Sequence, residues 1–151
     1  MSYYIDQSGK IESSTHTVLA LTNDVTHIVY IPRQEKNGAL VVLEQRYGER
    51  KRKQIYLWMF TAALYHVLQR MPSGSMATAD VEYTGHGEQI KAMLVQWWER
   101  EKSHLTTDSL RFGFVGDENP AHLKAIAAFR HKAKADRILK ADDLLTRIIG
   151  L

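Results

Sequence analysis

The chain contains no cysteine among its 151 residues. This absence excludes a disulfide framework and any metal site built on thiolates. No apolar run approaches the roughly 18 residues that a membrane-spanning helix requires, so we expect no membrane span. The first residues lack a basic flank ahead of an apolar stretch, which argues against a signal peptide. These absences together favour a reducing compartment, and we expect a cytoplasmic protein.

Several motifs that define common enzyme classes are also missing. The string GxGxxG does not occur, and the short stretch Gly85-His86-Gly87 lacks the lysine of a P-loop. The seven histidines form no zinc motif such as HExxH, and no GxSxG nucleophile motif is present. The sequence therefore gives no support to a dinucleotide-binding, P-loop, zinc-protease or serine-hydrolase interpretation.

Basic residues are present in a small excess and are concentrated in two places. The formal net charge is only +3, so the distribution is more informative than the total. Two clusters in so short a chain favour binding of phosphate groups, although a solvated helix face would explain either cluster alone. The first cluster consists of Arg50, Lys51, Arg52 and Lys53, and the second includes Arg130, Lys132 and Lys134.

The length suits a single domain, residues 1–151, with a sizeable core. Runs of β-branched and aromatic residues bounded by turn residues predict five strands, and apolar residues spaced by three and four predict helices between the later ones. Asn119 and Pro120 are a good N-cap and first residue for the last helical region. The predicted strands are 2–7, 17–21, 27–31, 79–83 and 110–115, and the predicted helices are 49–70, 88–102 and a region from 120 that breaks near 136.

Acidic residues follow several of these strands. Asp6 ends the first strand just before the turn residues Ser8-Gly9, and Asp80 and Glu82 share one face of the fourth because they are two residues apart. If the first and fourth strands are parallel neighbours, these acids converge at one edge of the sheet. Hard divalent cations such as Mg²⁺ prefer oxygen ligands, and two of them can promote phosphodiester cleavage. Asp117 and Glu118 follow the fifth strand and are candidates to complete the ligand set.

The order βββαβαβα, with Tyr4-Ile5-Asp6-Gln7-Ser8-Gly9 at its start, resembles the ribonuclease H-like superfamily. The segment from Asp80 to Glu88 is similar to Asp-x-Glu-Tyr-x-Gly strings of small archaeal members. The resemblance implies an α/β fold with a five-stranded mixed sheet flanked by helices. It also implies a nuclease or resolvase that uses Mg²⁺ or Mn²⁺ on DNA or RNA. The resemblance matches the superfamily's conserved acids to Asp6, to Asp80 or Glu82, and to Asp117 or Glu118. Catalytic positions would then be Asp6, Asp80, Glu82 and Asp117, Glu118 would be a further metal ligand, and the basic clusters would bind the nucleic acid.

The sequence departs from ribonucleases H in one respect and leaves alternatives open. The predicted helix 49–70 has no acid after its first residue, where those enzymes carry a glutamate, and Glu44 substitutes only if it lies in a helix. His86 and His122 are candidates for proton transfer or ordinary loop and helix residues. A non-catalytic nucleic-acid-binding module with structural acids is the second interpretation. The third is an adaptor that forms a homodimer through the helix carrying Trp97-Trp98.

Overall fold

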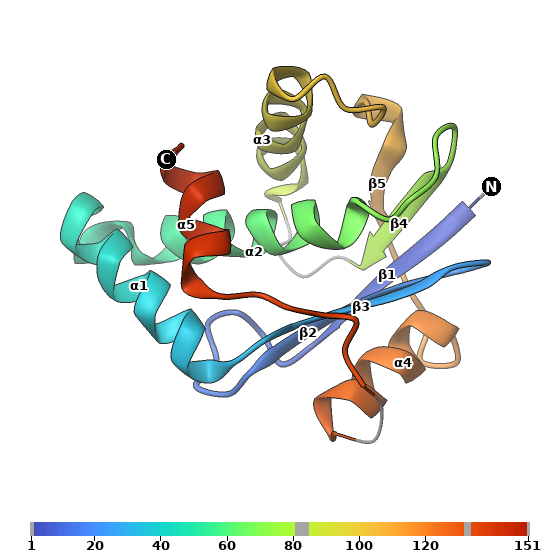
Figure 1. The fold of residues 1–151 in the computed structure, drawn as a ribbon, viewed down its shortest axis with the longest axis horizontal. Coiled ribbons are helices and arrows are strands. Elements are labelled where there is room, and N and C mark those ends of the chain that lie inside the picture. Colours follow the sequence, from blue (N-terminus) through green and yellow to red (C-terminus); the bar gives the residue numbers. More distant parts are fainter. Residues whose placement is uncertain (1, 81–84, 132–133, 151) are drawn as a thin grey trace.

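The computed structural model describes residues 2–80, 85–131 and 134–150. Within these ranges the chain forms a mixed six-stranded sheet with the strand order β5-β4-β1-β2-β3-β6 (Figure 1). β1 (Ser2–Ser8), β2 (Thr17–Thr22) and β3 (Thr26–Ile31) form an antiparallel meander. Asn23 and Asp24 form the turn between β2 and β3, as their turn chemistry predicts.

The other strands join this meander in parallel. β4 (Met76–Asp80) pairs with β1, so that Ile5 lies opposite Ala79. β5 (Leu110–Gly113) pairs with β4 at one edge of the sheet, and β6 (Arg137–Ile138) pairs with β3 at the other. The condition that the sequence left open is thus met: the first and fourth strands are parallel neighbours.

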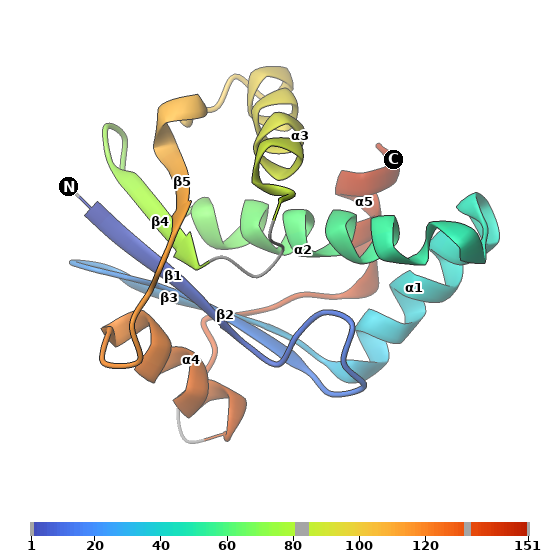
Figure 2. The ribbon, with the colours of Figure 1, turned by 180° about the vertical axis from the view of Figure 1, so that it is seen from behind.

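Helices cover both faces of the sheet (Figures 1 and 2). α4 packs against β1 and β2 on one face, and α2 packs against β2 and β3 on the other, where it also contacts α1, α3 and α5. Among the described residues, no helix combines the length and apolar character that crossing a bilayer demands. The helices are α1 (Arg33–Tyr47), α2 (Arg52–Leu68), α3 (Gly87–Arg100), α4 (Pro120–Phe129) and α5 (Ala141–Ile149), with short 3₁₀ turns at Glu49–Lys51 and Thr107–Ser109.

The sequence predicts five strands in total, and it predicts a single helix between the third and the fourth strand. Both predictions are wrong. The sheet has a sixth strand, β6, which lies in the region that the sequence assigned to a broken helix. Two helices, α1 and α2, precede β4, and they are separated at Gly48, whose φ of 93° is readily adopted only by glycine. The last helical region begins at Pro120 with the Asn119 side chain accepting from the Ala121 N–H, which confirms the predicted N-cap.

The main core lies between the sheet and the helices α1, α2, α3 and α5. The two adjacent tryptophans of α3 belong to it: Trp97 is 6% exposed and Trp98 is 1% exposed. Neighbouring helical residues point about 100° apart, which from the sequence alone predicts that one of the two rings faces outward. The prediction is wrong because Trp97 packs edge-on against Tyr65 of α2, so the buried face of α3 is wide enough for both rings.

One charged side chain, that of Lys36 in α1, is buried among these elements. Its Nζ donates to the carbonyl oxygens of Lys10 and Ser13 and to Oγ1 of Thr17, which ties α1 to the β1–β2 loop (residues 9–16). Burial lowers the pKa of Lys36 from its ordinary value of 10.5 to about 8, although Glu12 acts in the opposite direction. Burial of the charged Lys36 amine therefore lowers the stability of the folded protein at neutral pH. The amine also releases its proton more readily in the folded protein than in the unfolded chain.

A pH-dependent stability follows. Between pH 8 and 10.5 the unfolded chain holds more protons at Lys36 than the folded protein, so the contribution of this residue to stability rises with pH. We expect the free energy of unfolding of the wild type to increase relative to that of Lys36→Met across this window. Urea unfolding of both proteins at several pH values measures the difference. A difference that stays constant with pH would show that the burial of this amine does not change its ionisation.

Candidate functional site

Asp6 lies at the carboxyl end of β1 and is only 4% exposed. Its neighbour Ile5 packs into the main core, so the alternation of the strand turns Asp6 toward the opposite face, which α4 covers. There His122 of α4 donates from Nδ1 to Oδ2 of Asp6 over 2.6 Å, and the backbone N–H of Gln7 donates to Oδ1 over 2.8 Å. The aspartate is thus a buried, oriented acceptor.

Asp80 ends β4 beside Asp6. The register that pairs Ile5 with Ala79 brings the next residues, Asp6 and Asp80, level on neighbouring strands, and both line the same small cavity. Asp80 accepts the backbone N–H of Val115 on Oδ1 at 3.0 Å, which fastens the segment after β5 to the end of β4. The structure therefore brings together two acids that are 74 residues apart in the chain (80 − 6).

The electrostatics of Asp6 reflect this arrangement. Burial raises the pKa of the Asp6 carboxyl above its ordinary value, and the negative charge of Asp80 adds to the increase. The hydrogen bonds from Gln7 and His122 act in the opposite direction but do not outweigh burial. Two ionised carboxylates that line one small cavity repel each other unless a proton or a cation lies between them. A bound cation would relieve this repulsion and favour ionisation of both groups.

His122 connects the acid pair to solvent. Its side chain is 25% exposed, and its Nε2 lies 3.9 Å from Oδ1 of Asp117, a carboxylate that is 95% exposed. The bond from Nδ1 to Asp6 fixes the orientation of the ring and leaves Nε2 on the solvent side. The structure thus places His122 and Asp117, both sequence candidates, at the edge of the acid pair.

The structure describes only one of the two remaining acidic candidates. Glu118 is exposed, with no hydrogen bond to the pair, and Glu82 lies outside the described residues. Within the described ranges, no group of three or more His, Cys, Asp or Glu side chains is arranged to hold a metal ion. These residues therefore provide a carboxylate pair with an oriented histidine rather than a complete set of protein ligands.

Comparison of the chain with protein-family models finds no matching family, and comparison with curated proteins finds no matching relative.

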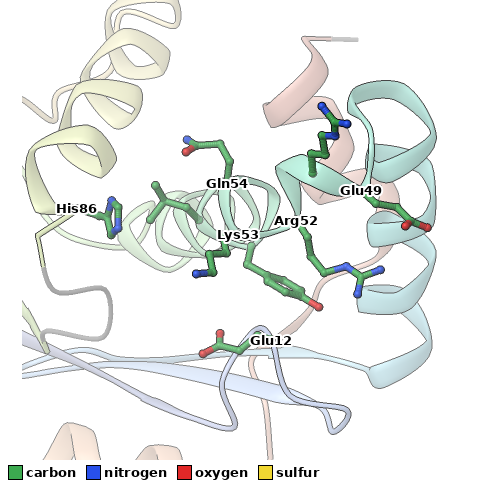
Figure 3. Close-up of a pocket in the computed structure, with 9 residues that line it drawn as sticks. Glu12, Glu49, Arg52, Lys53, Gln54 and His86 are labelled. Carbon is green, nitrogen blue, oxygen red and sulfur yellow. The ribbon is translucent and has the colours of Figure 1, made fainter.

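The first basic cluster lines a cavity of about 770 Å³ on the other face of the sheet. Figure 3 shows His86, at the start of α3, on one side of this cavity, with Lys53 of α2 pointing between it and Glu12 of the β1–β2 loop. His86 lines this cavity and not the small one shared by the two aspartates. The full lining consists of Glu12, Glu49, Arg50, Arg52, Lys53, Gln54, Tyr56, Leu57 and His86. Lys51, the remaining residue of the cluster, does not line it.

The basic residues differ in whether they have partners. Arg52 forms a double hydrogen bond with Glu44 of α1, at 3.1 and 2.9 Å. Glu44 lies in α1, so it meets the condition for taking the place of the first-helix glutamate of ribonucleases H. Its side chain nevertheless pairs with Arg52 and not with the acid pair. The second basic cluster lies after the end of α4, and its described residues, Arg130 and Lys134, are not in a helix. Both are exposed, and Lys132 lies outside the described residues.

Apart from His86, the cavity residues outside the basic cluster were not predicted as site residues. Leu57 belongs to the main core and Tyr56 packs against it, so their apolar character alone marks them as core residues, and Glu12 lies in a loop with no motif. Their meeting at one cavity depends on how the β1–β2 loop packs beside α2 and α3, and no local sequence signal encodes that packing.

Proposed function

We propose that this protein is a divalent-metal-dependent nuclease or resolvase that cleaves phosphodiester bonds in nucleic acid, on a ribonuclease H-like fold. The observation that carries the proposal is the juxtaposition of Asp6 and Asp80 at the carboxyl ends of two neighbouring parallel strands. Open α/β sheets commonly bind their ligands at this edge. The strand order supports the superfamily resemblance, because it makes the first and fourth strands neighbours.

The donor atoms of the pair fit a hard cation such as Mg²⁺ or Mn²⁺. Each carboxylate oxygen has two lone pairs, so the single hydrogen bonds at Oδ1 and Oδ2 of Asp6 and at Oδ1 of Asp80 leave acceptor capacity on both residues. Mg²⁺ is often held by one or two carboxylates while it keeps several waters. When bound, the ion would supply an activated water and charge stabilisation for the leaving oxygen.

His122 is the residue best placed to move a proton in such a reaction. Asp6 holds its ring through Nδ1, and Nε2 faces the solvent side beside Asp117. A water that attacks a phosphodiester must lose a proton, and a histidine with a free nitrogen within reach can accept it. Asp6 would then have two roles, because it contacts the cation and also positions the histidine.

A non-catalytic nucleic-acid-binding module is the second candidate. It is favoured by the pairing of Glu44 with Arg52 and by the absence, within the described residues, of a third acidic ligand beside the pair. Under this interpretation Asp6 serves mainly to hold α4 through His122.

A cleavage assay separates the two candidates. Branched DNA and an RNA–DNA hybrid are incubated with the protein in Mg²⁺, in Mn²⁺ and in EDTA. The proposal predicts cleavage of at least one substrate with a metal ion and none in EDTA. Binding of these substrates without cleavage under any of the conditions would favour the non-catalytic module.

A further inference from the structure

The cavity beside α2 has the size of a site for one small ligand. Its volume of about 770 Å³ falls within the range of about 300–1,000 Å³ that is usual for such sites. It lies between the N-terminal part of α2, the β1–β2 loop and the start of α3 (Figure 3). Most of the basic cluster contributes to it, which favours an anionic ligand.

The charges around the cavity are mixed rather than uniformly positive. Arg52 is already neutralised by Glu44, whereas Arg50 and Lys53 form no ion pair with any residue that the structure describes. The carboxylates of Glu12 and Glu49 also line the cavity. Two available cations suit one phosphate group, and the carboxylates would repel a second phosphate. A continuous phosphate backbone therefore fits this cavity poorly.

The rest of the lining suits a base. The half-buried ring of Tyr56 and the buried Leu57 offer apolar surface, and aromatic rings are common stacking partners for unpaired bases. Gln54 and Glu12 carry groups that can accept hydrogen bonds from the amino groups on base edges. An apolar surface beside two cations and several acceptors matches the parts of a single nucleotide.

The position of the cavity relates it to the acid pair. β1 runs from Asp6 directly into the loop that carries Glu12, and the segment after Asp80 leads to His86. The cavity and the pair thus lie at the same edge of the sheet, on opposite faces. A nucleic-acid strand with one nucleotide in the cavity and its scissile phosphate at Asp6 and Asp80 would pass around this edge.

We propose that the cavity lined by Arg50, Lys53 and Tyr56 holds one unpaired nucleotide of the substrate, with its phosphate on the two cations and its base toward Tyr56. This inference rests on the proposed function and narrows its substrate to nucleic acid with single-stranded character near the site of cleavage. A blunt duplex cannot place a base in the cavity without unpairing it, and unpairing costs a few kcal/mol.

Binding without cleavage tests this inference. A fluorescein-labelled single strand of about ten nucleotides, within the usual site size of single-strand binding folds, and the duplex of the same sequence are titrated with the protein in EDTA. The variants are Lys53→Gln and the control Lys102→Gln, which removes the same charge from an exposed position just after α3 that lines neither cavity. Fluorescence anisotropy at several salt concentrations gives the affinity and its salt dependence, and thermal unfolding confirms that both variants fold.

The single strand is expected to bind several-fold more tightly than the duplex. Lys53→Gln should weaken single-strand binding and reduce the salt slope by about 0.7, the value for one lost phosphate contact on a single strand, while Lys102→Gln should change neither. Equal losses in the two variants, or equal affinity for strand and duplex, would overturn the inference and leave the proposed function standing. If neither nucleic acid binds the wild type, the proposed function fails as well.

Discussion

Asp6→Asn is expected to reduce metal-dependent cleavage at least about a hundredfold, since a metal ion supplies several kcal/mol of stabilisation and each 1.4 kcal/mol is about tenfold in rate. The substitution keeps the size of the side chain but removes its charge. It weakens the binding of any cation that Asp6 and Asp80 hold together. It also weakens the hydrogen-bond acceptor that orients His122. Rates with branched DNA and RNA–DNA hybrid in Mg²⁺ or Mn²⁺ measure the effect.

Two controls make this result specific. Asp24→Asn removes an exposed carboxylate from the β2–β3 turn, and it should leave the cleavage rate unchanged. Thermal unfolding of Asp6→Asn shows whether the variant folds, because removal of a buried hydrogen-bonding group can destabilise a protein by about 1–3 kcal/mol. Cleavage by a folded Asp6→Asn protein at the wild-type rate would eliminate Asp6 as a catalytic residue.

Trp98→Ala is expected to lower the free energy of unfolding by about 3–5 kcal/mol, the usual cost of truncating a buried aromatic side chain to alanine. Trp98 is among the largest fully buried side chains, and α3 packs it into the main core beside α2. The prediction also bears on the adaptor hypothesis, in which the Trp97-Trp98 helix forms a homodimer. Chemical unfolding measures the stability, and light scattering measures the oligomeric state.

The matched control is Val41→Ala in α1, where the side chain is 55% exposed. It should change stability by no more than about 0.5 kcal/mol, as is typical of exposed positions. If Trp98→Ala kept the stability of the wild type while converting a dimer to monomers, the assignment of this ring to the core would be wrong.

The strands that form the meander could be predicted from sequence because each is short, contains β-branched or aromatic residues in a run, and is closed by turn residues or proline. α1 could not, and Lys36 shows why. The buried positions of this helix are Lys36, Ala39 and Leu43, which have helical spacing, but one of them is a charged residue. The apolar pattern of α1 is therefore incomplete, and the segment around Leu43 is ambiguous between helix and strand. β6 was missed because its two residues are both exposed and carry no pattern.

The candidate site was predictable only in part. The positions of Asp6 and Asp80 after strands made them candidates, but their proximity depends on the pairing of β1 with β4, which is a property of the whole sheet. His122 was a candidate because it lies in the first turn of α4 near Asp117, yet its bond to Asp6 depends on how α4 packs across β1 and β2. Glu82 lies outside the described residues, so its place in the cation site stays a prediction.

Calorimetric titration of the wild type and of Asp80→Asn with Mn²⁺ tests the central claim most directly, because it measures the cation itself and does not depend on the choice of substrate. The account predicts that the wild type binds Mn²⁺ and gains about 2.7 kcal/mol of stability when the free ion is at about 100 times its Kd, while the variant loses most of both effects. A wild type that neither binds Mn²⁺ nor is stabilised by it would show that Asp6 and Asp80 do not form a cation site.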